Sequence, residues 1–179
     1  MDDRAVVEIQ IRRPPRSAVI VESRCHLGLP VVTQVPPILD DGTPFPTTHW
    51  LTCPLAGLRI ARLEADGGVK SADADLAADP DLARRFAEAA TRYRMARDAM
   101  IHPGYRGPRP SGGIAGSDGA VKCLHAQYAD TRAGNDNPIG ERVRGSVEPL
   151  DCTVPCVIEE SGRPVSNAEW HEPGGTDRP

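Results

Sequence analysis

Aromatic residues are scarce in this sequence: Phe, Trp and Tyr together make up 4% of its 179 residues. Hydrophobic residues as a whole still reach 39%, which predicts one core built from Leu, Val, Ile and Ala side chains. No apolar run approaches the roughly 18–20 residues that a membrane-spanning helix needs. The first residues, Met1 to Arg4, also lack the apolar stretch of a secretory signal. We therefore expect a cytoplasmic protein that makes no contact with a membrane.

An excess of basic charge is also missing. The net charge is −4, and the residues from Asp151 onward hold six acidic and two basic side chains, so residues 1–150 are neutral as a whole. A neutral body argues against a general nucleic-acid binder. The polar, acidic end instead predicts a disordered tail over residues 158–179, behind a single globular domain of residues 1–157.

The sequence contains no Cys-x-x-Cys pair, the spacing that often marks a zinc site or a redox motif. It does contain five cysteines, which are spread along the chain: Cys25, Cys53, Cys123, Cys152 and Cys156. Structural disulfides are rare in a reducing cytoplasm. We therefore expect these residues to be thiols, metal ligands or redox groups.

The hydrophobic pattern predicts an α+β fold, with a small antiparallel sheet in the N-terminal third packed by about three helices. Two stretches rich in Val and Ile, residues 17–24 and 31–35, flank a turn that contains Gly and Pro, so they are expected to pair as a hairpin. A short extended piece follows at residues 47–52. Residues 5–11 fit either a strand or a short helix capped by an acidic residue before it.

Proline marks the starts of the predicted helices. Pro54 is suited to the first helical position, and Gly67-Gly68 is suited to ending the same helix. Asp79-Pro80 opens the longest helix, in which apolar residues recur every three or four positions. The predicted helices are residues 54–66, 80–101 and 121–132, with a weak helix that ends at residue 147.

The longest predicted helix and the Gly- and Pro-rich loop after it, residues 102–119, are rich in arginine. Seven arginines lie between positions 84 and 109, a composition that suits binding of a phosphate or a nucleic-acid backbone. One hypothesis is therefore an anion- or nucleic-acid-binding module through residues 84–109. Its contacts would be Arg92, Arg94 and Arg97. The alternative is a solvated helix face whose arginines pair with acidic residues one turn away.

Several short strings occur in an order that resembles one known family. They are Arg13-Pro14-Pro15-Arg16, Arg24-Cys25, Asp41-Gly42-Thr43-Pro44, Trp50-Leu51-Thr52-Cys53-Pro54, Arg62-Leu63-Glu64, Lys122-Cys123-Leu124-His125 and Asn137-Pro138-Ile139-Gly140. Over residues 5–157 the chain resembles the bacterial domain-of-unknown-function family 501, which is common in actinobacteria. The resemblance implies no activity, because none is established for that family. It does imply that four residues correspond to the family's motif cysteines: Cys25, Cys53, Cys123 and Cys156.

The chain departs from that family's pattern at two positions. His49 stands where an aromatic residue is common, and Asp130 stands where a histidine often follows the Lys-Cys-Leu-His string. A role that relatives give to that histidine does not transfer to this chain.

The first functional hypothesis is a metal site with a structural or regulatory role, holding zinc or an iron–sulfur cluster. Four thiolates satisfy tetrahedral zinc, and four thiolates also hold a cluster. The predicted ligands are Cys25, Cys53, Cys123 and Cys156. The alternative ligands are Cys152, which would replace Cys156, together with His49 and His125.

Two other interpretations of the cysteines remain open. Free cysteine is often buried as a small hydrophobe, which would make these residues structural. Alternatively, the protein is a thiol-dependent enzyme that uses Cys53 or Cys123, because a helix N-terminus favours the thiolate. Side chains two residues apart on a regular helix point about 200° apart. Cys123 and His125 therefore share a site only if the helix begins after Cys123.

Overall fold

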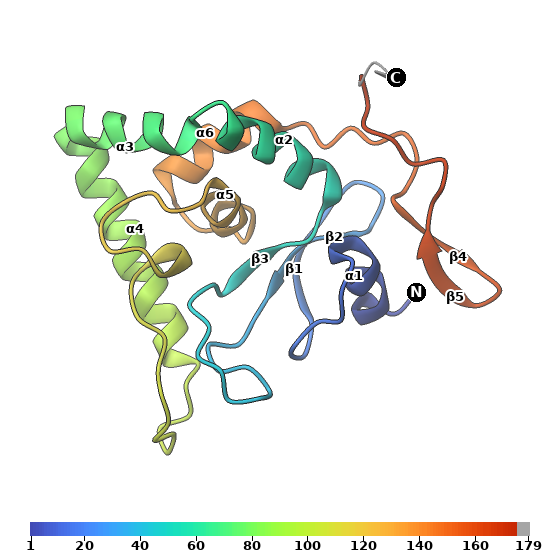
Figure 1. Cartoon of the computed structure of the whole chain (residues 1–179), viewed down its shortest axis with the longest axis horizontal. Coiled ribbons are helices and arrows are strands. Elements are labelled where there is room, and N and C mark those ends of the chain that lie inside the picture. The colour runs from blue at the N-terminus through green and yellow to red at the C-terminus, as the bar shows by residue number, and fades with distance from the viewer. Residues whose placement is uncertain (175–179) are drawn as a thin grey trace.

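A three-stranded antiparallel sheet lies at the centre of the computed structural model, which describes residues 1–174 (Figure 1). In order across the sheet, its strands are β1 (Ile20–Arg24), β2 (Pro30–Gln34) and β3 (His49–Leu51). Gln34 of β2 is opposite His49 of β3, and Thr33 is opposite Trp50. The predicted α+β class, the hairpin and the short extended piece are confirmed.

The segment that fitted either a strand or a helix is helix α1 (Asp3–Ile11). Asp2 is its N-cap, because the Asp2 carboxylate accepts a hydrogen bond of 3.0 Å from the backbone N–H of Ala5. The helix buries Val6 and Val7. It lies beside β2 and the C-terminal strands described below (Figure 1).

Two helices follow β3 where the sequence predicted one. α2 (Pro54–Ala65) begins at Pro54 as predicted and ends before Gly67, whose φ of 86° is in the left-handed region. Gly68 then begins α3 (Gly68–Ala78), which the sequence pattern missed. No residue of α3 is fully buried, although Val69, Ala72 and Leu76 pack partly buried against the main hydrophobic cluster. The sequence pattern missed this helix because Gly67-Gly68 predicts an end to helical structure and no capping side chain marks a new start.

α4 (Pro80–Ala99) is the longest helix, and Asp79 caps it by accepting hydrogen bonds from the backbone N–H groups of Asp81 and Leu82. Its buried residues are Leu82, Phe86, Ala89, Tyr93 and Arg97. The sequence pattern placed Ala96 and Met100 at the end of this stripe, but both are exposed. Arg97 takes their place because its guanidinium binds the loop that follows the helix.

α5 (Leu124–Arg132) and α6 (Pro138–Val147) complete the core. α5 contacts β3, α2 and α6, and most of its residues are buried. The side chains of Leu55, Ile60, Tyr128 and Ile139 meet in the main hydrophobic cluster, each at most 1% exposed. Residues 102–119 form the predicted loop, interrupted by one 3-10 turn, η1 (Ile114–Gly116).

The structure differs from the expected disordered tail over much of its length. β4 (Val157–Glu160) and β5 (Arg163–Ser166) form an antiparallel hairpin. Ser161 and Gly162 at its tip both have positive φ, which suits a tight hairpin turn. The hairpin packs on α1 (Figure 1), a contact that the polar composition does not reveal. Residues 175–179, the end of the predicted tail, lie outside the described residues.

The described residues hold six α-helices in place of the three or so that the sequence predicted. None of the helices within residues 1–174 is both long enough and apolar enough to cross a bilayer.

Candidate functional site

Four of the five cysteines line one small cavity, called here the four-cysteine cavity. Cys25 comes from the turn between β1 and β2, Cys53 from the N-cap of α2, and Cys152 and Cys156 from the segment before β4. The cavity has a volume of about 10 Å³, which is room for roughly one water molecule. The fold therefore brings together three of the predicted ligands and the alternative ligand Cys152.

Cys123, the fourth predicted ligand, does not line this cavity. It is the N-cap of α5 and packs beside Tyr93 of α4 and Ile114 of η1, where it lines a different pocket. The tertiary structure thus separates Cys123 from the other predicted cysteines, and Cys152 occupies the fourth position around the cavity.

Cys123 lies instead beside Glu64 and His125. A carboxylate oxygen, the Cys123 Sγ atom and a ring nitrogen of His125 all lie within 4.8 Å of one another. The Nδ1 atom of His125 is 3.2 Å from Glu64 Oε1. That oxygen also accepts a hydrogen bond of 2.6 Å from the backbone N–H of Leu124. Because α5 begins only at Leu124, the extended backbone of Cys123 (φ −160°, ψ 123°) allows both side chains to face one point.

The surroundings of His125 favour a positive charge at this point. The Cys123 side chain is the main cause that raises the pKa of His125 to about 9, with the charge of Glu64 adding to the effect and partial burial opposing it. The Nε2 atom of His125 is 3.2 Å from the carbonyl oxygen of Gly57. A carbonyl oxygen only accepts hydrogen bonds, so Nε2 carries a proton and Nδ1 is the nitrogen that faces the carboxylate and the thiol.

A pocket of about 340 Å³ opens beside Cys123 and His125. The other residues that line it are Thr47, His49, Trp50, Leu51, Ala115 and Ala126. Glu64 is not part of this lining, so it approaches His125 from outside the pocket. The volume falls in the range of small-molecule sites, and two titratable side chains of the cluster are in contact with it.

His49 is a second histidine on the same pocket. Its Nδ1 atom is 2.5 Å from Glu22 Oε2, and its Nε2 atom is 3.6 Å from Asp130 Oδ1. Asp130 is 2% exposed, and burial raises the pKa of its carboxyl group. The two positions at which the chain departs from the family pattern are therefore neighbours in space, and both belong to one polar cluster behind the pocket.

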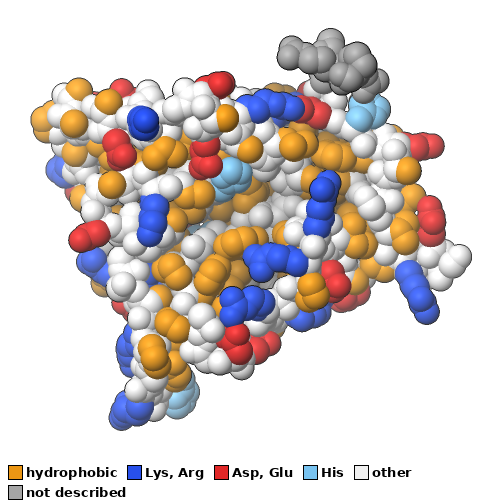
Figure 2. All heavy atoms as spheres, in the orientation of Figure 1, with side chains coloured by type: hydrophobic (Ala, Val, Ile, Leu, Met, Phe, Trp, Pro, Cys, Tyr) orange, Lys and Arg blue, Asp and Glu red, His pale blue; other side chains and the backbone are white. Residues whose placement is uncertain are grey.

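The arginine-rich helix does not present its predicted anion-binding residues together. Arg97 is 1% exposed and donates hydrogen bonds to Asp98 at 2.9 Å and to the carbonyl oxygen of Gly112 at 2.8 Å. Arg92 donates to the carbonyl oxygen of Asp136. On the face drawn in Figure 2, basic side chains are interspersed with acidic and hydrophobic ones. The alternative, a solvated face with arginine–acid pairs one turn apart, holds at Arg84, which pairs with Asp81 and Glu88, whereas Arg92 and Arg97 bind backbone carbonyl oxygens.

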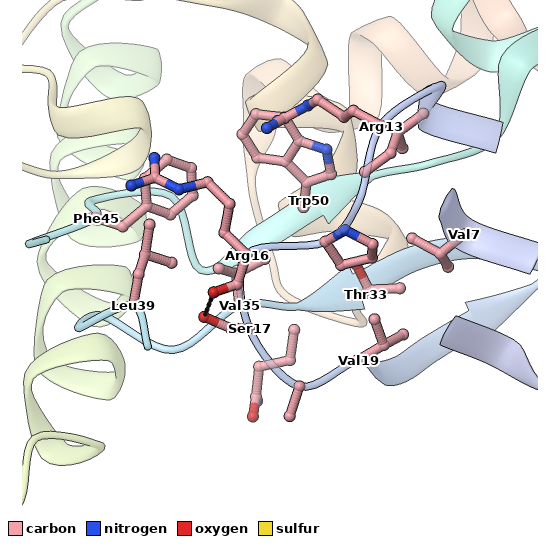
Figure 3. Close-up of a pocket in the computed structure, with 14 residues that line it drawn as sticks. Val7, Arg13, Arg16, Ser17, Val19, Thr33, Val35, Leu39, Phe45 and Trp50 are labelled. Atoms are coloured by element: carbon pink, nitrogen blue, oxygen red, sulfur yellow. Dashed lines mark hydrogen bonds between the residues drawn. The ribbon is translucent and has the colours of Figure 1, made fainter. Parts of the chain in front are cut away.

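An apolar cavity of about 100 Å³ lies between α1 and the sheet, and sequence reasoning did not find it. The rings of Phe45 and Trp50 lie 5.5 Å apart, and the guanidinium of Arg13 lies over Trp50 at 5.4 Å (Figure 3). Aliphatic residues such as Val7 and Leu39 line the cavity together with the polar residues Arg16, Ser17, Thr33 and Gln34 (Figure 3). Its lining includes the two arginines Arg13 and Arg16 but no Asp, Glu, His or Cys, so it offers no metal ligand and no acid–base group that titrates near neutral pH.

Glu64 is the member of the metal-ligand cluster that the sequence did not suggest as a ligand. It belongs to the Arg62-Leu63-Glu64 string, but its neighbours Cys123 and His125 lie about 60 positions further along the chain. No local spacing connects these residues. The Arg62-Leu63-Glu64 string was the one feature of the sequence that drew attention to Glu64.

A family model described as "Protein of unknown function (DUF501)" matches residues 21–145 of the chain. This span includes Glu64, Cys123 and His125, whereas Cys152 and Cys156 lie beyond it. Neither the curated proteins nor the solved structures contain a match to the chain.

Proposed function

Because the chain belongs to the DUF501 family of proteins of unknown function, we propose its function from its own geometry: it binds a zinc-type metal ion through Glu64, Cys123 and His125. This cluster is called the open metal centre below. The fourth coordination position of the ion would face the pocket that Cys123 and His125 line.

The observation that supports this proposal most is the convergence of three different donors on one point. In a nucleophile–histidine–carboxylate triad, the nucleophile and the carboxylate lie on opposite sides of the imidazole, each about 3 Å from a different ring nitrogen. Here the sulfur, the carboxylate oxygen and one ring nitrogen lie within 4.8 Å of one another. Donors that share one side of the ring are arranged as ligands of a common ion.

The hydrogen bond of His125 to Gly57 strengthens the argument. A metal-binding histidine typically donates its other ring N–H to a backbone carbonyl or a carboxylate, which fixes the tautomer and the ring orientation. In this chain Nε2 faces the Gly57 carbonyl oxygen at 3.2 Å. The lone pair of Nδ1 is then directed at Glu64 Oε1, also at 3.2 Å, and two acceptors this close require a cation between them, either a proton or a metal ion.

The donor set suits zinc. A mixture of thiolate, imidazole and carboxylate is a typical zinc ligand set, with bonds that place neighbouring ligand atoms about 3.3–3.8 Å apart. The limit of 4.8 Å on the three donor atoms means that small side-chain rotations would reach this spacing. Three protein ligands with an open position are characteristic of catalytic zinc, which acidifies a bound water molecule. His49 also lines the pocket, but its ring nitrogens face Glu22 and Asp130.

A cobalt titration tests the proposal. Purified full-length protein is stripped of metal and loaded with Co²⁺. It is compared with the variants Cys123→Ser and His125→Ala and with the control variant His102→Ala, whose exposed histidine lies outside this cluster and outside the four-cysteine cavity. We expect wild type and the control to bind Co²⁺ at the open metal centre, and a small ligand such as azide to change the visible spectrum of that Co²⁺. Unchanged stoichiometry and spectrum in both cluster variants would refute the proposal.

A second candidate function is thiol chemistry at Cys123, favoured by the contact between its sulfur and His125. An imidazolium beside a sulfur stabilises the thiolate. Cys53, the other predicted nucleophile, is a poor one because burial raises its pKa to about 12. Rapid alkylation of Cys123 by iodoacetamide that Zn²⁺ does not slow would favour this candidate over the metal centre, whereas protection by Zn²⁺ would support the metal centre.

A further inference from the structure

We infer that Cys25, Cys53, Cys152 and Cys156 form a second metal site, with all four coordination positions filled by protein, in which a single zinc-type ion links the C-terminal hairpin to the sheet and to α2. This inference is independent of the open metal centre, because the two sites share no residue and lie in separate cavities.

The lining of the four-cysteine cavity offers four sulfur atoms and one amide side chain, that of Gln10, as groups able to contact a metal. The residues around it besides the cysteines are Gln10, Leu27, Leu29, Pro30, Pro54, Leu55, Leu150 and Trp170. None of these side chains ionises, so the four thiols are the titratable groups of an otherwise apolar cavity. Thiolate sulfur is a soft ligand that favours zinc or iron–sulfur clusters over magnesium or calcium.

N–H donors are directed at two of the four sulfurs. The Gln10 side chain lies 3.6 Å from Cys156 Sγ, and the Trp170 indole N–H lies 3.4 Å from Cys152 Sγ. A neutral thiol is a weak hydrogen-bond acceptor, whereas a metal-bound thiolate carries negative charge and accepts such bonds well. Buried polar groups that point at sulfur are therefore better explained by thiolates than by thiols.

The positions of the cysteines on the backbone are those that ligands require. Cys25 begins a tight turn in which its carbonyl oxygen accepts a hydrogen bond of 2.9 Å from Gly28, whose φ is 79°. Cys53 is the N-cap of α2, so its side chain lies at the first turn of that helix. A tight turn and a helix N-terminus both fix the position of the backbone that carries the sulfur.

The size of the cavity favours one ion over a cluster. Its volume of about 10 Å³ admits roughly one water-sized particle, whereas an iron–sulfur cluster introduces several further atoms between the cysteines. Among residues 1–174 no three of these sulfurs lie within 4.8 Å of one another. Closing the site on an ion therefore requires rotation about the single side-chain torsion of one or more cysteines, which leaves the backbone in place.

The inferred role follows from where the ligands lie. Cys25 and Cys53 belong to the body of the fold, while Cys152 and Cys156 flank the segment that leads into β4. A closed tetrathiolate zinc site contributes directly to folding stability. Removing the ion would release the segment around residues 152–170 before it unfolds the core.

Metal analysis of single variants tests the inference. Full-length protein is purified without a metal-binding tag. Its zinc content is measured by inductively coupled plasma mass spectrometry, and its visible spectrum is recorded. Wild type should contain zinc at this site. The variants Cys25→Ser and Cys152→Ser should lose this zinc, whereas Cys123→Ser should retain it. Cys25 and Cys152 are chosen because both are only partly buried, and circular dichroism verifies that the variants fold.

Cobalt separates the two sites in one sample. A four-thiolate Co²⁺ site gives intense sulfur-to-metal absorption that azide cannot alter, since no coordination position is open. Loss of that absorption in Cys152→Ser but not in Cys123→Ser supports the closed site even if the open metal centre fails its own test. If the purified protein instead contains iron and shows the visible absorption of an iron–sulfur cluster, the inference of a single ion is overturned. Equal metal content in wild type, Cys25→Ser and Cys152→Ser, or disulfides among these four cysteines, would overturn the site itself.

Discussion

The imidazole of His125 lies between Glu64 Oε1 and the carbonyl oxygen of Gly57, at 3.2 Å from each. Both neighbours accept hydrogen bonds, so the ring is held in one orientation with a cation required on its Nδ1 side. In the metal-free protein that cation is a proton, and in the metal-bound protein it would be the ion. The proton and the metal therefore compete for one position.

This competition predicts how the stability of the metal-free protein depends on pH. The folded protein raises the pKa of His125 from 6.5 to about 9, so the protonated ring stabilises the fold fully below pH 6.5. That contribution is lost as the pH rises through about 9. We expect the free energy of unfolding, measured in urea with a chelator present, to fall by about 1–2 kcal/mol more in wild type than in His125→Gln between pH 6.5 and 9.5. Parallel pH profiles for the two proteins would contradict the assigned environment.

Removing the charge of Glu64 should weaken the open metal centre. In Glu64→Gln the amide oxygen still accepts from the Leu124 N–H, so the start of α5 is preserved, but the anionic ligand is gone. We expect Zn²⁺ affinity at this centre to fall at least about tenfold, measured by competition with a chromophoric chelator. The control Glu8→Gln changes an exposed residue of α1 and should leave the affinity unchanged.

Arg97 should be required for the stability of the loop after α4. Its replacement by alanine leaves the carbonyl oxygen of Gly112 without its donor inside the protein and removes the ion pair with Asp98. A loss of about 2–4 kcal/mol in unfolding free energy is expected, together with faster proteolysis within residues 102–119. Arg94→Ala, on the exposed side of the same helix, should change stability by less than about 0.5 kcal/mol.

Two glycines of α6 should respond oppositely to alanine. A Cβ atom at Gly140 would collide with the Thr131 hydroxyl and with the carbonyl oxygen of Gln127, whereas a Cβ atom at Gly145 meets nothing within 4 Å. Gly140→Ala should therefore destabilise the protein by about 1–3 kcal/mol. Gly145→Ala should stabilise it by up to about 1 kcal/mol, since alanine is the better helix former. The midpoint temperature of thermal unfolding, measured for both variants and wild type, tests this prediction. A Gly140→Ala protein as stable as wild type would mean that α5 and α6 are packed less closely than described.

The parts of the fold that sequence predicted are those with local signals. Pro54 and Asp79-Pro80 mark the starts of α2 and α4 because capping depends on neighbouring residues alone. The sequence analysis missed α3 because its N-cap, Gly67, has no side chain to signal a helix start and its apolar residues are only partly buried. It missed the β4–β5 hairpin because that hairpin packs on α1, which is distant in sequence. Arg97 is buried in place of the predicted apolar residues because it binds carbonyl oxygens of the following loop. The periodicity of apolar residues along a helix carries no information about such a contact.

In the candidate sites, too, the sequence predicted what depends on residue type and missed what depends on contacts distant in sequence. Cysteine chemistry suggested a metal, but nothing in the spacing of Cys123 relative to Cys25 indicated that α5 would carry it to another pocket. Glu64 became a candidate ligand only when the fold placed α2 against the start of α5. Residue type thus predicted the kind of chemistry, while the grouping of ligands depended on tertiary contacts.

The α-amino group of Met1 lies 3.7 Å from a carboxylate oxygen of Glu159, and α1 packs on the hairpin that contains this residue. Protein synthesis proceeds from the N-terminus, so during translation α1 emerges from the ribosome soon before β2 but long before β4 and β5. Val6 of α1 shares a hydrophobic cluster with Leu29, which follows within about 25 residues, and with Val157, which follows about 150 residues later. A ribosome stalled before β4 would therefore hold a chain in which α1 can pack on β2 but lacks its contacts with the hairpin.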